Sequence, residues 1–144
     1  MARLVVDASV AVKWLVPEDG SAAAEALRGQ DLHAPTLMRI EVGNVLRTLA
    51  ARGALDEGAA REALVLLLDA PVTWHEPDPA LLRDALDIAL ALRHPVYDCL
   101  SLALAIRIEG PLVTADRRFH KATSDGPDLR GPDLRGIVRP LGSE

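Results

Sequence analysis

The segment 3–10 constrains this chain more than any other, because it joins a buried strand directly to a carboxylate. Residues 4–6 (Leu-Val-Val) form a short apolar run, which predicts a strand buried on both faces, as in a parallel sheet. Asp7 follows at once, and ligands of open α/β sheets bind beyond the carboxyl ends of the strands. Asp7 is therefore either part of a binding site or the cap of a helix that begins near Val10.

Length and composition predict one globular domain that covers residues 1–144. The chain is 49% hydrophobic and 26% charged, which provides enough apolar surface for a core. Its single cysteine, Cys99, cannot form an internal disulfide, so a reducing compartment is expected. No secretory signal pattern is present, and no apolar run reaches the ~18 residues of a membrane span. We therefore expect a soluble, cytoplasmic protein with no membrane partner.

Strand-like and helix-like segments alternate along the chain, with two helical segments between several of the strands. This alternation predicts an α/β fold, a three-layer α/β/α sandwich with a mainly parallel central sheet. Ser21, Asp56 and Asp78 are expected to cap helices, and Pro35 to be the first residue of one. The strands are expected at 4–6, 32–34, 72–75, 112–114 and 137–139, and the helices at 10–16, 21–28, 36–52, 57–68, 79–93, 97–108 and 116–122.

A five-residue tandem repeat interrupts this pattern near the C-terminal end. Residues 126–130, Gly-Pro-Asp-Leu-Arg, are repeated at once as residues 131–135. Segments rich in glycine and proline do not sustain regular structure. The repeat therefore predicts an exposed loop, lengthened by a local duplication, that carries no chemistry.

Four acidic residues occupy positions at which the expected fold could gather them. Asp7 and Asp116 follow buried strands, whereas Glu41 and Asp98 lie on helices expected to pack on the same sheet. Glu41 is expected at the edge of an apolar stripe formed by Ile40, Val45 and Leu49, and Asp98 in the first turn of its helix. Each acid alone has a simpler role, as a solvated or capping residue. Four separate roles of this kind explain the pattern less well than one shared site does.

Carboxylates crowded at one end of a sheet raise one another's pKa values unless a cation lies among them. Ligand sets made only of oxygen select hard ions such as Mg²⁺ or Mn²⁺. Such an ion polarises a phosphodiester and lowers the pKa of a bound water. The four acids therefore indicate phosphodiester hydrolysis.

Four ordered blocks of the sequence resemble the PIN domain, and specifically the VapC-type toxins of bacterial and archaeal toxin–antitoxin pairs. The resemblance implies an endoribonuclease dependent on Mg²⁺ or Mn²⁺, a homodimer, and inhibition by a cognate VapB-like antitoxin whose tail covers the site. The blocks are Asp7 to Val10; Pro35, Leu37, Glu41, Val42, Asn44 and Leu46; Tyr97 and Asp98 with the helix of small residues behind them; and Leu112 to Phe119.

The same resemblance assigns roles to individual residues. It implies that Asp7, Glu41, Asp98 and Asp116 form the catalytic and metal-binding set, with Asp7 and Asp98 as direct ligands. It further implies that Ser9, Asn44 and Thr114 orient these acids. Some relatives carry another acid soon after the last one, whereas Arg117 and Arg118 follow here, so a second metal ion would be weakly held until RNA supplies phosphate oxygens.

Net charge argues against diffuse binding of RNA, because the chain carries a formal charge of −5. Aromatic residues make up only 3%, which also disfavours a base-stacking platform. RNA therefore needs a local basic patch, and Arg117, Arg118 and Lys121, with His120, supply one unless they form an ordinary solvated helix face. Further candidates for the patch are Lys13, Arg39 and Arg93, whereas His33, His75, His94 and His120 show no ligand spacing.

Two rival classes of function remain at this stage. A haloacid-dehalogenase-like phosphatase would carry a second Asp two residues after Asp7, where Ser9 stands, and a receiver domain would carry paired acids near its first strand. The second rival is a catalytically silent PIN-like domain that binds RNA or protein. A cleavage assay separates that rival from the nuclease.

Overall fold

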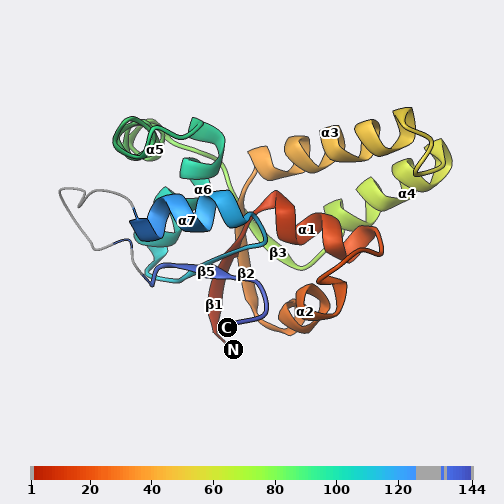
Figure 1. Ribbon diagram of the computed structural model, residues 1–144, viewed down its shortest axis with the longest axis horizontal. Helices are drawn as coiled ribbons and strands as arrows, with labels where there is room; N and C mark the ends of the chain where they lie inside the picture. Colours follow the sequence, from red (N-terminus) through yellow and green to blue (C-terminus); the bar gives the residue numbers. More distant parts are fainter. Residues whose placement is uncertain (1, 126–133, 135, 144) are drawn as a thin grey trace.

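A five-stranded parallel sheet lies at the centre of the structure, a computed structural model that describes residues 2–125, 134 and 136–143 (Figure 1). Its strands are β1 (Arg3–Val6), β2 (Asp31–Pro35), β3 (Val72–His75), β4 (Leu112–Thr114) and β5 (Val138–Pro140), in the order β3-β2-β1-β4-β5. Each neighbouring pair is parallel. The first strand, β1, is therefore at the centre of the sheet, and the last, β5, is at one edge.

Helices cover both faces of this sheet. Figure 1 shows α1 to α4 on one side of β1 and α5 to α7 on the other. The predicted α/β sandwich with a mainly parallel sheet is therefore confirmed. The helices of the described residues are α1 (Ala8–Leu15), α2 (Ser21–Ala26), α3 (Leu37–Ala51), α4 (Glu57–Leu68), α5 (Pro79–Leu92), α6 (Val96–Ile108) and α7 (Arg117–Asp125), with a short 3₁₀ helix at Leu27–Gly29.

The alternation of side chains along β1 divides the core into two parts. Leu4 and Val6 pack into a cluster with the apolar faces of α1, α3 and α4, whereas Val5 packs with α5, α6 and Phe119 of α7. All three strand residues are almost fully buried. This burial fixes the end of β1 and therefore the position of Asp7.

Two predicted helix caps are confirmed and two details of the prediction are wrong. Asp56 and Asp78 accept hydrogen bonds from the first turns of α4 and α5. Ser21, however, is the first residue of α2, whose cap is Gly20 at φ 89°, and its hydroxyl accepts from the N–H of Glu18 instead. Pro35 ends β2 rather than starting a helix, because it still pairs with His75 of β3 and α3 begins only at Leu37.

The buried stripe of α3 also differs from the predicted one. Met38, Val42 and Leu46 are the buried residues, whereas Ile40 is 71% exposed and Val45 is 36% exposed. Apolar residues occur on both sides of this helix, so periodicity alone did not identify the buried side. Glu41 still lies beside the buried stripe, because it precedes Val42.

The duplicated loop at 126–135 lies outside the described residues except for Leu134. Leu134 is only 6% exposed and packs in the core cluster that contains Val5. The prediction of an exposed loop is therefore wrong at this residue, because the second copy of the repeat supplies a core side chain.

No single helix within residues 2–125, 134 and 136–143 has the length and hydropathy of a membrane span. The consecutive helices α5 and α6 meet that criterion only when they are taken together, and they are bent by 118°.

Candidate functional site

Asp7 lies at the carboxyl end of the central strand, where two hydroxyl groups hold its carboxylate. Thr114, at the end of β4, donates from Oγ1 to Oδ2 at 2.5 Å, and Ser9 of α1 donates from its hydroxyl to Oδ1. Asp7 also caps α1 through a longer contact of 3.4 Å from the N–H of Val10. The predicted alternatives therefore coexist, because one carboxylate both caps a helix and faces the end of the sheet.

Backbone groups of the β4–α7 connection fix the direction of these hydroxyls. The N–H of Ala115 donates to Ser9 Oγ at 2.9 Å, and the N–H of Asp116 donates to Thr114 Oγ1 at 3.0 Å. Each hydroxyl therefore accepts from the backbone and gives its own proton to Asp7. This arrangement requires Asp7 to act as the acceptor, as an ionised carboxylate does.

Burial opposes that ionisation. Asp7 is 7% exposed, and desolvation raises its pKa from 3.8 to about 6, against the hydrogen bonds from Ser9 and Thr114, which lower it. The charge of Asp98 raises the pKa of Asp7 further. The hydroxyls therefore hold a carboxylate that the chain itself leaves insufficiently compensated.

Glu41, in the second turn of α3, shares this environment. Desolvation, followed by the charges of Asp98 and Asp7, raises its pKa from 4.5 to about 7. Within the described part of the chain, no group donates a hydrogen bond to its carboxylate. The charge of Asp98 thus raises the pKa values of both Asp7 and Glu41, which come from separate elements at one end of the sheet.

Asp98, in the first turn of α6, is the third member of this group. Its Oδ2 lies 2.6 Å from Nε2 of His94, whose ring packs against Phe119 with centroids 4.9 Å apart. Asp98 is directly followed by the fully buried Cys99, and burial together with Asp98 raises the pKa of that thiol to about 12. Cys99 is therefore an un-ionised core residue.

Asp116 is held differently from the other three acids. Its Oδ1 accepts from the N–H groups of Arg118 at 3.0 Å and Phe119 at 3.2 Å, so it caps α7. Its backbone N–H binds the hydroxyl of Thr114, which in turn binds Asp7. Asp116 is therefore linked to the group of three acids through Thr114, and its carboxylate is oriented by a helix terminus.

The chemistry of this group fits a hard divalent cation. All its candidate ligands are carboxylate oxygens, which Mg²⁺ and Mn²⁺ prefer, and a cation would relieve the repulsion that raises the pKa values of Asp7 and Glu41. No three Asp, Glu, His or Cys side chains of the described residues already lie close enough to hold a metal ion. The acids of the described residues therefore share one end of the sheet without forming a complete set of ligands there.

The residues expected to orient the acids divide into two groups. Ser9 and Thr114 make the predicted contacts with Asp7. Asn44 is exposed on α3, and its side chain makes no hydrogen bond to an acid within the described residues. One turn of helix separates Asn44 from Glu41, but the structure does not join them.

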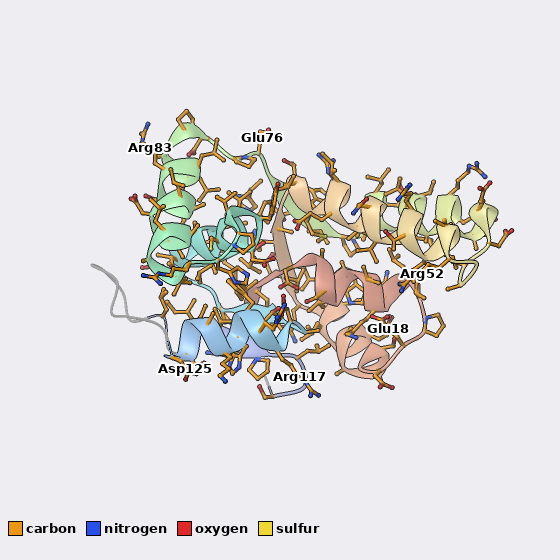
Figure 2. The ribbon with its side chains drawn as sticks, turned by 45° about the horizontal axis from the view of Figure 1, so that its top comes forward. Glu18, Arg52, Glu76, Arg83, Arg117 and Asp125 are labelled. Atoms are coloured by element: carbon orange, nitrogen blue, oxygen red, sulfur yellow. The ribbon has the colours of Figure 1, made fainter. Side chains whose placement is uncertain are left out.

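The basic residues beside Asp116 form an exposed group at the start of α7. Arg117, Arg118 and Lys121 are exposed, and Figure 2 shows Arg117 and Asp125 at the two ends of this helix. Two of the other basic candidates are engaged elsewhere. Lys13 pairs with Glu18 at 3.1 Å, and the guanidinium of Arg39 lies 5.2 Å from the centre of the Trp74 ring.

Histidine contacts were not foreseen from the sequence. His33 Nδ1 lies 2.8 Å from His75 Nε2 across β2 and β3, and His94 contacts Asp98. The spacing of four residues between His94 and Asp98 is a signal that sequence reasoning could have used. The break at Pro95 concealed it, because an i,i+4 contact is expected only within one helix.

Comparison with known proteins places this site in a family context. The family model described as "PIN domain" matches residues 4–124. Ribonuclease VapC3 of Pyrobaculum aerophilum is 40% identical over 122 residues, which cover 81% of this chain and 92% of the relative. The matched span contains Asp7, Glu41, Asp98 and Asp116.

Solved structures share the fold. The crystal structure of PAE2754 from Pyrobaculum aerophilum superposes with a TM-score of 0.68 at 25% identity, covering 84% of this chain and 79% of that one. The structure of VapBC2 from Rickettsia felis bound to a DNA fragment from their promoter gives a TM-score of 0.65 at 13% identity, covering 96% and 98%. At that identity the second likeness shows the fold alone.

Proposed function

We propose that this chain, which belongs to the PIN domain family, is a divalent-metal-dependent endoribonuclease and the toxin of a toxin–antitoxin pair. The family membership predicted from the sequence is confirmed by the match over residues 4–124 and by the 40% identity to a VapC ribonuclease. The name of that relative supports RNA as the substrate. We take the whole chain, 1–144, as one such domain, acting in the cytoplasm where its RNA substrate is found.

One observation carries the proposal: Asp7, Glu41 and Asp98 converge on the carboxyl end of the sheet without a protein cation among them. Within the described residues, no Lys or Arg side chain pairs with any of the three. Uncompensated partly buried carboxylates are costly to a fold, so their retention indicates use by a ligand. A cation such as Mg²⁺ or Mn²⁺ is that ligand.

The residues would divide the work as follows. Asp7, Glu41 and Asp98 would hold Mg²⁺ or Mn²⁺, with Asp116 completing the set directly or through water. Once bound, the ion would polarise the phosphodiester and supply a water of lowered pKa for in-line attack. Ser9 and Thr114 hold Asp7 in its ionised form by donating hydrogen bonds to both of its oxygens. Arg117, Arg118 and Lys121 would bind phosphates of the RNA.

Two protein partners complete the proposal. A VapB-like antitoxin is supported by the relatives named VapC, such as Ribonuclease VapC3 of Pyrobaculum aerophilum at 40% identity. A homodimer is supported by an exposed apolar stripe on α5, because side chains four residues apart lie on one face of a helix. The stripe consists of Leu82, Leu86 and Leu90, which are 49%, 51% and 69% exposed.

The proposal is tested by cleavage of RNA with Mg²⁺ or Mn²⁺, using wild type, Asp7→Asn and the matched control Asp78→Asn. Asp78 is an acid outside the site that pairs with Arg107. We expect EDTA and Asp7→Asn to abolish cleavage, and Asp78→Asn to retain it. Equal cleavage by wild type and Asp7→Asn would reject the metal-nuclease function. Metal-independent RNA binding without cleavage would instead favour the catalytically silent PIN-like domain.

A further inference from the structure

His94 lies in the connection between α5 and α6 and contacts the candidate site from outside the set of acids. Its Nε2 is 2.6 Å from Oδ2 of Asp98, a distance typical of a strong, charge-assisted hydrogen bond. The two side chains are 17% and 31% exposed. This contact is therefore partly shielded from water, unlike an ordinary surface pair.

The backbone fixes the ring from one side. Arg93 adopts a left-handed conformation at φ 52°, and the N–H groups of Arg93 and His94 both donate to the carbonyl of Ala89. Pro95 follows and restricts the chain at the start of α6. The connection is thus a short, well-determined cap, which gives His94 little freedom relative to Asp98.

Packing fixes the ring from the other side. The imidazole lies against the fully buried ring of Phe119, with centroids 4.9 Å apart and planes inclined by 42°. Phe119 belongs to α7, whose first turn is capped by Asp116. His94 therefore bridges two elements of the site, because its backbone follows α5 while its ring rests on α7.

Only one of the two carboxylate oxygens of Asp98 takes part in the contact with His94. Oδ2 accepts a hydrogen bond from Nε2 of His94, whereas Oδ1 accepts no hydrogen bond within the described part of the chain. Asp98 is also the acid whose charge acts on both Asp7 and Glu41. The orientation of this one carboxylate therefore bears on the whole cluster.

We propose that His94 is the positioning residue of Asp98: its Nε2–H donates to Oδ2 and holds the carboxylate so that Oδ1 remains available to a divalent cation. This inference rests on the proposed metal-dependent function. Partners outside the ligand set orient metal ligands in many proteins, and their loss typically weakens metal binding ~10- to 100-fold. A purely structural contact would affect folding stability without affecting metal affinity.

Two substitutions separate the hydrogen bond from the packing of the ring. His94→Phe keeps an aromatic ring against Phe119 but removes the donor, whereas His94→Gln keeps an N–H donor at a similar reach and removes the ring. His33→Leu is the matched control, because His33 Nε2 lies 3.0 Å from Asp31 Oδ1 in a histidine–aspartate contact outside the site. Thermal melts establish that each variant is folded.

The measurement is the dissociation constant of Mn²⁺, read from the electron paramagnetic resonance signal of the free ion. We expect His94→Phe to bind Mn²⁺ about 10- to 100-fold more weakly than wild type. His94→Gln should bind within a few-fold of wild type, and His33→Leu should match it. In RNA cleavage, raised Mn²⁺ should restore His94→Phe, because the defect lies in metal affinity.

Three outcomes overturn the inference: unchanged affinity in His94→Phe, a loss in His94→Gln as large as that in His94→Phe, or an equal loss in His33→Leu. If His94→Phe does not fold, His94→Gln decides alone, since retained affinity supports the donor role and lost affinity contradicts it. Asp7→Asn distinguishes the two levels of the proposal. Weak binding by Asp7→Asn beside normal binding by His94→Phe rejects only the role of His94, whereas normal binding by Asp7→Asn rejects the metal site as well.

Discussion

Asp78 and Asp7 differ in the groups that surround their carboxylates and in the direction in which their pKa values are shifted. Asp78, at the start of α5, accepts two hydrogen bonds from Arg107, at 2.7 and 3.1 Å, and one from the N–H of Leu81 at 2.8 Å. The guanidinium of Arg107 lowers the pKa of this exposed carboxyl. Asp7 is buried, accepts from two neutral hydroxyls, and has a pKa raised to about 6.

The two acids differ in whether a Lys or Arg side chain pairs with them. The chain contains 16 Lys and Arg residues, and several of them pair with exposed acids, as Arg107 does with Asp78. Within the described residues it places none in an ion pair with Asp7, Glu41 or Asp98. Local rules of stability are broken in natural proteins mainly at functional sites. This absence of a nearby Lys or Arg is the basis for our proposal that a divalent cation supplies the missing charge.

Supplying that charge from the protein should have the largest effect. In Glu41→Lys an ammonium group would stand near Asp7 and Asp98, so the repulsion that these two acids exert on Glu41 would be replaced by attraction. We expect this variant to lose Mn²⁺ binding and to cleave RNA at least about 100-fold more slowly, since several kcal/mol of transition-state stabilisation come from the ion. Its melting temperature without metal, at pH 8, should exceed that of wild type.

Glu41→Gln is the matched control for this substitution. It removes one negative charge without adding a positive one, so it should also lose cleavage but gain less thermal stability. Cleavage by Glu41→Lys at the wild-type rate would contradict the account, because a Lys side chain among the acids would then be compatible with function.

The pH dependence of stability should reveal the raised pKa of Asp7. Because the folded state holds its proton up to about pH 6 and the unfolded state releases it near 3.8, the folded protein binds more protons between these values. The contribution of Asp7 to the free energy of unfolding is therefore fully present below about pH 4 and falls as pH rises through about 6. The loss amounts to at most about 3 kcal/mol, at 1.36 kcal/mol per pKa unit.

Denaturant unfolding of metal-free wild type and Asp7→Asn across pH 4 to 8 measures this contribution as a difference. Asp7→Asn should gain stability relative to wild type as pH rises. Mg²⁺ should reverse the trend by stabilising only the wild type. A difference that is constant with pH would show that the pKa of Asp7 is the same in the folded and unfolded states, which contradicts the prediction.

Removing one hydroxyl from the Asp7 network should have the smallest effect of the three. Thr114→Val keeps the shape of a buried strand residue but deletes the hydrogen bond to Oδ2, which is worth about 1.5 to 3 kcal/mol when the acceptor is charged. The pKa of Asp7 should rise further, so the pH profile of cleavage should shift to higher pH. Thr123→Val, a buried threonine of α7 that donates to His120, is the control and should not shift it.

Much of the frame of this molecule could be predicted from its sequence. Residues 4–6 indicate a buried strand because a short β-branched, apolar run is typical of a strand covered on both faces. Asp56 and Asp78 identify helix starts because their side chains satisfy free N–H groups of the first turn. These features are local in sequence, so local rules identify them.

What could not be predicted depends on register and side-chain direction. The contact of His33 with His75 requires the alignment of β2 with β3, which the sequence does not encode locally. His94 reaches Asp98 only because Arg93 adopts a left-handed conformation that ends α5. The direction of the Asp116 carboxylate toward the N–H groups of α7 is likewise a property of the folded loop.

Binding of Mn²⁺ at pH 8 tests the central claim most directly, with wild type, Asp7→Asn and Asp78→Asn compared by titration calorimetry. At this pH Asp7 and Glu41 are both ionised, since their pKa values are about 6 and about 7. We predict that wild type and Asp78→Asn bind with the same dissociation constant, and that Asp7→Asn binds at least about 10-fold more weakly. Equal binding by wild type and Asp7→Asn, or no binding by wild type, would contradict the account.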